Sequence, residues 1–186
     1  MNNLRLFMIL IGAELTQRHT EQHDVYFGIG EKWEDLVPGI KLFWPDAKKL
    51  HVDAWRAVQH VEEFEIRVVS KLESALQEEV SQKLFFLNLG GYKRDEFNEF
   101  HYKMVCVAPD KAQAVVAGKK TAFFKHTSLP EAGSHVDDKY GIDVDDLYAL
   151  EDIMAENVMA PYRIAILPAA PNAEADKINL GYFKFK

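Results

Sequence analysis

Four pairs of side chains in this sequence combine residue types and spacings that are suited to chemistry. The pairs are Glu21 with His23, His51 with Asp53, Glu99 with His101, and His135 with Asp137. Their imidazoles and carboxylates are the groups that build oxygen and nitrogen metal sites and that act as general acids and bases. Each pair is spaced by two residues, which on a strand places both side chains on one face. The eight residues are therefore the candidate binding residues of the chain.

The same pairs also fit a purely structural role, and the sequence favours that interpretation. In it, each histidine opens a strand, each glutamate bonds to loop amides, and His-Val-Asp forms a turn whose aspartate caps a helix. The sequence therefore assigns no catalytic residue, no metal ligand and no cofactor. A binding site and a metal-dependent enzyme remain the alternatives. We expect each Glu-x-His pair to contact the His-Val-Asp segment that follows it.

The pairs recur because the sequence repeats itself. Residues 6–41 align with residues 84–119 at a constant offset of 78 without a gap, and Gly12 and Gly90 are among the identical positions. After a six-residue insertion, His51-Val52-Asp53 aligns with His135-Val136-Asp137. Self-similarity of this kind predicts one structural unit used twice. We expect a first copy at residues 1–70, a connector at 71–83 and a second copy at 84–186, with both copies sharing one core.

Hydrophobic patterns predict the elements that position these residues. Continuous apolar runs bounded by glycine indicate buried strands, and alternating runs indicate strands with one buried face. Apolar residues at helical spacing from Glu31 indicate a helix that Pro38 kinks or splits and Pro45 ends. The expected strands are 5–11, 23–29, 65–70, 84–89, 101–108, 163–167 and a last strand to Phe185; the further helices follow Asp53 and span 110–120 and 145–155. The predicted fold class is α+β, with two β-β-α-(α)-β units related by pseudo-two-fold symmetry and antiparallel first and second strands.

Composition and motif content argue against several classes of function. The 186 residues are 48% hydrophobic and carry a net charge of -7 without a block of Lys and Arg, which argues against nucleic acid as a partner. No apolar run approaches the roughly 20 residues of a membrane helix. The single Cys106 excludes an internal disulfide and fits a reducing cytoplasm. Motifs of the common nucleotide-binding and hydrolytic enzymes are absent. We therefore expect a small cytoplasmic binding or interaction module without catalysis, whose partner is a small molecule or a protein, and we leave homo-oligomer formation open.

Three motifs of the second copy carry a family resemblance. LNLGGY at Leu87–Tyr92, FNEFH at Phe97–His101 and HVDD at His135–Asp138 resemble a small bacterial family described only as a domain of unknown function, present in one or two copies per protein. The first copy departs from these motifs, with Leu10 for Asn88, Ala13 for Gly91 and Ala54 for Asp138. The resemblance covers nearly the whole chain and implies no activity, substrate or catalytic residue.

Overall fold

The computed structural model describes residues 3–73, 81–92, 96–127 and 143–185. The chain divides into two compact units: unit 1 comprises Met1–Gln77 with Met154–Lys186, and unit 2 comprises Glu78–Ile153. The last 33 residues thus group with the first unit, whereas the sequence assigned them to a second copy. The candidate residues His135 and Asp137 lie outside the described residues.

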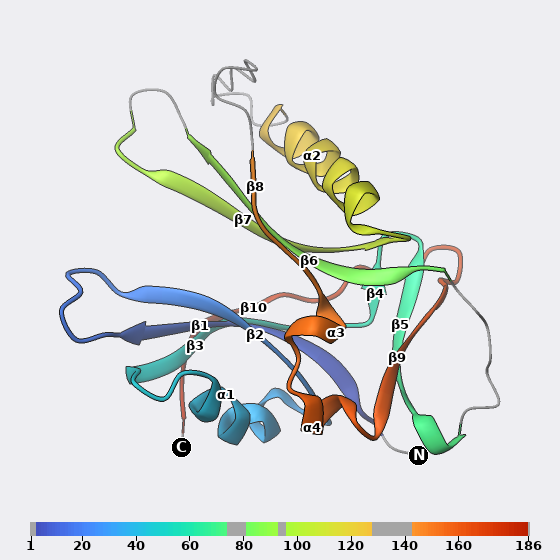
Figure 1. The fold of residues 1–186 in the computed structure, drawn as a ribbon, viewed down its shortest axis with the longest axis horizontal. Coiled ribbons are helices and arrows are strands. Elements are labelled where there is room, and N and C mark those ends of the chain that lie inside the picture. The colour runs from blue at the N-terminus through green and yellow to red at the C-terminus, as the bar shows by residue number, and fades with distance from the viewer. Residues whose placement is uncertain (1–2, 74–80, 93–95, 128–142, 186) are drawn as a thin grey trace. The chain divides into compact units, whose positions relative to one another are not determined.

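Unit 1 is built on an antiparallel sheet with the strand order β10-β3-β1-β2 (Figure 1). Its strands are β1 (Arg5–Glu14), β2 (Gln22–Gly30), β3 (Lys48–Val58) and β10 (Asn179–Lys184). The short helices η1 (Trp33–Leu36) and α1 (Val37–Phe43) pack against one face, where alternate residues of β1, namely Phe7, Ile9 and Ile11, are buried with Trp33 and Ile40. The opposite face of β1 carries Gly12, which lies between β2 and β3.

A second sheet of unit 1 has the order β4-β5-β9. It is formed by β4 (His60–Val61), β5 (Phe64–Ser70) and β9 (Tyr162–Pro168), with η2 (Lys71–Glu73) after β5 and α4 (Glu156–Met159) before β9. The predicted counterparts 65–70 and 163–167 therefore pair with each other along one antiparallel ladder. The carboxylate of Asp176, 3% exposed, accepts the backbone N–H groups of Gln59 and His60 and holds the chain after β9 against the end of β3.

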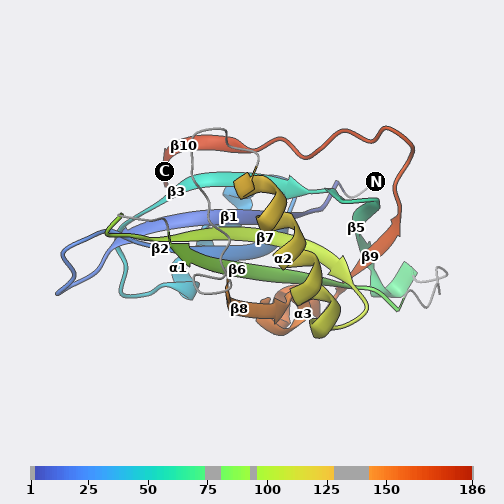
Figure 2. The same cartoon turned by 90° about the horizontal axis from the view of Figure 1, so that it is seen from above.

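Unit 2 contains an antiparallel sheet with the order β7-β6-β8, covered on one face by α2 (Figures 1 and 2). The elements are β6 (Lys83–Tyr92), β7 (Glu99–Ala108), α2 (Lys111–Thr127), β8 (Asp143–Ala149) and α3 (Leu150–Ile153). Phe85, Leu87 and Leu89 of β6 share the core under α2 with Cys106, which is fully buried. Candidate residues of odd number on β7 consequently project from the other face.

The α+β prediction was wrong, because the described residues form mostly antiparallel β-sheet, with few helices of which only α2 is long. The error lies in two segments. Residues after Asp53, predicted as a helix, belong to β3, and residues 143–149, largely predicted as a helix, form β8. Both strands contain a bulge opposite the central strand, between Val52 and Ala54 in β3 and between Val144 and Asp146 in β8.

The bulges explain why these strands looked helical. An extra residue in a strand changes which face the following side chains occupy. Val52 and Trp55 therefore reach the same core although they are three residues apart, and Val144 and Leu147 do the same in unit 2. A spacing of three mimics helical periodicity.

Other expectations for the local structure were correct. The first two strands are antiparallel, and α2 lies at the position of the helix predicted from residue 110. Proline splits the first helical segment, since η1 ends at Leu36 and α1 begins with Pro38 in its first turn. Within the described part of the chain, no helix combines the length and the apolar character needed to cross a membrane.

Candidate functional site

The first candidate site gathers around Gly12 on the open face of the unit 1 sheet. In the strand registers, Gly12 lies opposite His23 of β2 on one side and His51 of β3 on the other. Asp53 follows His51 by two residues and so lies on the same face, at the bulge of β3, and Glu21 directly precedes β2. The two strands that flank β1 thus bring together four side chains, which we call the four-residue cluster: Glu21, His23, His51 and Asp53.

Each histidine of this cluster contacts both carboxylates. Nε2 of His23 lies 3.1 Å from Asp53 Oδ2 and 3.7 Å from Glu21 Oε2. Nε2 of His51 lies 3.1 Å from Asp53 Oδ1 and 3.3 Å from Glu21 Oε1. The expected approach of Glu-x-His to His-Val-Asp therefore occurs in unit 1, although His-Val-Asp is part of a strand and not a turn.

The tautomer of His51 follows from its second ring nitrogen. Nδ1 lies 2.8 Å from the carbonyl oxygen of Lys49. A carbonyl oxygen only accepts hydrogen bonds, so Nδ1 carries the proton and donates it. A neutral ring then presents a lone pair at Nε2. This is the arrangement of metal-binding histidines, whose other nitrogen commonly donates to a backbone carbonyl.

The contacts of His51 Nε2 are not aligned as hydrogen bonds. His51 is 2% exposed, and among the described residues neither its Nε2 nor Asp53 Oδ2 has a hydrogen-bond partner. Two ligands of one tetrahedral zinc ion, each about 2.0–2.2 Å from the metal, lie roughly 3.3–3.6 Å apart. The observed histidine–carboxylate separations of 3.1–3.7 Å bracket this range, and each carboxylate turns one oxygen toward His23 and the other toward His51.

Gly12 lies directly beneath the four-residue cluster. A Cβ atom added to it would lie 2.6 Å from His51 Nε2 and 2.7 Å from Asp53 Oδ2, closer than real Cβ atoms approach other atoms. Only glycine, which has no side chain, leaves room for the side chains of His51 and Asp53 to lie over the central strand at this position. The glycine found at corresponding positions of the sequence repeat therefore has a steric reason connected with the cluster.

Neighbouring residues cover and hold His51. The ring of Tyr182 on β10 packs against the imidazole at an interplanar angle of 39° with a centroid separation of 4.1 Å, and Lys184 Nζ lies 5.5 Å from the centre of the tyrosine ring. Lys49, whose carbonyl binds His51, has a positive φ of 51°. Its ammonium group donates to Glu14 Oε1 at 2.7 Å, and this hydrogen bond, followed by the charge of Glu14, raises the pKa of Lys49. His51 is thus enclosed, whereas His23 and Glu21 are 41% and 43% exposed.

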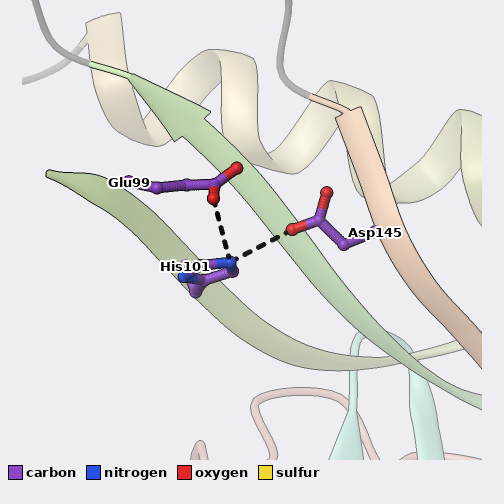
Figure 3. A group of neighbouring side chains, drawn as sticks. All are labelled: Glu99, His101 and Asp145. Atoms are coloured by element: carbon purple, nitrogen blue, oxygen red, sulfur yellow. Dashed lines mark ion pairs between the residues drawn. The ribbon is translucent and has the colours of Figure 1, made fainter.

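Unit 2 contains a related but smaller group, the three-residue cluster of Glu99, His101 and Asp145 (Figure 3). Glu99 and His101 come from β7 and Asp145 from the bulge of β8. His101 Nε2 lies 3.2 Å from Asp145 Oδ2 and 4.0 Å from Glu99 Oε2, and one ligand atom from each residue lies within 4.8 Å of the others. All three side chains are partly exposed, between 32% and 40%.

Asp145 is the site residue that the sequence comparison missed. Gly90 pairs with His101 and with Asp143, as Gly12 pairs with His23 and His51. The segment in the register of His51-Val52-Asp53 is consequently Asp143-Val144-Asp145. The sequence alignment used His135-Val136-Asp137, which shares Val and Asp with this segment, has the additional histidine and lies outside the described residues. The apolar pattern of β8 could have identified this strand, but the bulge gives its apolar residues a spacing of three, which is typical of a helix.

A family model matches the part of the chain that contains the first site. Residues 18–68 match the family model described as Domain of Unknown Function (DUF1543), so the predicted resemblance to a domain of unknown function is confirmed for this part of the chain. All members of the four-residue cluster lie within the matched residues. No curated protein matches the chain at a significant level.

A solved structure shares the fold of the whole chain. It is the crystal structure of a protein Il1583 from Idiomarina loihiensis, with a TM-score of 0.63 and 18% sequence identity over 98% of this chain and 99% of that one. At this identity the likeness establishes the fold alone. The chemistry of the two clusters therefore has to be argued from their own geometry.

Proposed function

We propose that this protein is a metal-binding module that holds one divalent transition-metal ion, with Zn²⁺ as the best fit, between Glu21, His23, His51 and Asp53. The observation that carries the proposal is the buried Nε2 of His51. Its ring is oriented by a backbone carbonyl, it faces two carboxylates, and among the described residues no group donates to it. A cation between these groups satisfies the imidazole lone pair and both carboxylates at once.

The ligand types support zinc over the harder cations. Two imidazole nitrogens and two carboxylate oxygens are a mixed set that suits Zn²⁺ and its neighbours among the transition metals, whereas Ca²⁺ and Mg²⁺ select oxygen ligands. Four protein ligands complete a tetrahedral sphere. A complete sphere leaves no position for a substrate, as in structural zinc sites. The proposal therefore retains the expectation of a binding module without catalysis, but it departs from the expectation that the chain has no metal ligand.

The charges of the cluster also favour a bound divalent cation. The two carboxylates of the cluster repel each other, and their partial burial strengthens this repulsion. A divalent cation cancels their two negative charges.

The test is zinc binding by the full chain after treatment with a chelator. Calorimetric titration of the wild type is expected to show a zinc equivalent that His51→Ala loses. His19→Ala is the matched control, because His19 is an exposed histidine of the β1–β2 loop outside the cluster. Since His51 is buried, Asp53→Asn serves as a second variant that preserves side-chain shape. If both variants bind zinc with the stoichiometry and affinity of His19→Ala, the proposal is wrong.

A further inference from the structure

We infer that the three-residue cluster of unit 2 is a second divalent-cation site, with open coordination positions and a preference for an oxygen-seeking cation such as Mn²⁺. This inference goes beyond the proposed zinc site and rests on separate residues: Glu99, His101 and Asp145. Nothing in the geometry of unit 2 depends on whether unit 1 binds metal.

The three groups are held by the sheet itself. Glu99 and His101 are two residues apart on β7 and project from the face opposite α2. Asp145 is fixed by its neighbour Asp146, which accepts hydrogen bonds from Asn88 Nδ2 at 3.0 Å and from Tyr148 Oη at 3.4 Å. These bonds anchor β8 to the central strand at the bulge, so that Asp145 projects toward His101 rather than along the strand edge (Figure 3).

Gly90 makes room for this arrangement. A Cβ atom at Gly90 would meet the Asp145 carboxyl group, with its Cγ and Oδ1 only 2.8 Å away. The carboxylate thus lies across the central strand in contact range of the backbone. The same steric relation holds between Gly12 and Asp53 in unit 1. In each unit, an aspartate at a strand bulge thus lies over a glycine of the central strand and points toward a histidine.

The ligand set differs from that of unit 1 in number and type. The register position of His51 is occupied in unit 2 by Asp143, so the cluster offers one imidazole and two carboxylates. Oxygen-rich sets suit Mn²⁺ and Mg²⁺, and the imidazole adds affinity for Mn²⁺. Three protein ligands leave about three positions of an octahedral ion free. The exposure of all three side chains gives water or a small anionic ligand access to them.

The experiment measures Mn²⁺ binding by the full chain. Free Mn²⁺ is quantified by electron paramagnetic resonance, and the relaxation rate of water protons reports coordination positions that exchange with solvent. We expect the wild type and His51→Ala to bind Mn²⁺ with strongly enhanced water relaxation. His101→Ala and Glu99→Gln should each weaken this binding at least tenfold. Glu96→Gln is the matched control, since it removes the same charge from an exposed residue outside the cluster.

The possible outcomes separate the two sites. Loss of Mn²⁺ binding in His101→Ala but not in His51→Ala or Glu96→Gln supports the second site, whether or not zinc binds in unit 1. Equal Mn²⁺ binding by His101→Ala, Glu99→Gln and the control overturns it. Bound Mn²⁺ without enhanced relaxation contradicts the open coordination sphere. Failure of zinc binding with intact Mn²⁺ binding defeats only the proposed function.

Discussion

Gly12→Ala tests the unit 1 site without removing any ligand. The added methyl group would begin 2.6 Å from His51 Nε2, and ordinary contact requires at least 3.4 Å, so the imidazole and the methyl group must separate by a further 0.8 Å. Asp53 Oδ2 starts only 2.7 Å away and must move as well. Metal sites tolerate displacements of about 0.2 Å in ligand distance. The variant therefore cannot keep both groups in bonding positions.

The expected magnitude follows from effects of misplaced ligands. Disturbing the groups that orient a metal ligand typically costs about 10–100-fold in affinity, which corresponds to roughly 1.4–2.7 kcal/mol of binding free energy. Stability without metal should change little, because alanine is favoured over glycine within a strand by about 0.5–1 kcal/mol and this gain offsets the crowding. The signature is weaker zinc binding with nearly unchanged unfolding of the metal-free protein.

The assay pairs zinc titration with urea denaturation in the presence of a chelator. Gly30→Ala is the control, since it adds the same methyl group to β2 where the nearest atom lies 3.1 Å away and belongs to Lys32 rather than to the cluster. Wild-type zinc affinity in Gly12→Ala would refute the steric argument and with it the assignment of the cluster. A large loss of metal-free stability would show instead that Gly12 serves packing.

Three further predictions concern stability. Asp176→Ala should lower the free energy of unfolding by about 1–3 kcal/mol in urea denaturation, because the N–H groups of Gln59 and His60 lose a charged acceptor; an unchanged midpoint would mean that water replaces the carboxylate without loss. Glu62→Asn should raise the free energy of unfolding by about 1 kcal/mol, because Glu62 has a φ of 54°, which asparagine adopts more readily; equal or lower stability would contradict this. Burial, and then the charge of Glu63, raises the pKa of Glu62 above its ordinary 4.5. Between the two pKa values the folded chain still holds this proton, whereas the unfolded chain has lost it. The contribution of the protonated Glu62 to stability is therefore complete below the unfolded pKa and disappears as the pH rises through the folded pKa. Glu62→Gln should flatten this part of the stability profile, and a slope equal to that of the wild type would count against the assignment.

Much of the local structure was readable from the chain because it depends on neighbouring residues. The apolar runs of β1 and β6 identify central strands, Pro38 marks the start of a helix, and the spacing of Glu21 and His23 places both at one end of β2. The repeat offset of 78 places Gly12 and His23 at the positions of Gly90 and His101, and in each sheet the glycine pairs with the histidine. These features require no knowledge of distant partners.

The bulges and the pairing partners of the later strands were decided by the tertiary structure. A bulge inserts one residue into a ladder, and its position depends on the strand opposite, so the pattern of β3 alone resembled a helix. The joining of β10 to β3 and of β9 to β5 likewise depends on chain segments more than 90 residues apart. Residue types along the sequence thus determined which groups were available for chemistry. Only the registers of the folded sheets decided that Asp145 stands beside His101, because the face on which a side chain lies depends on the partner strand as well as on the alternation within its own strand.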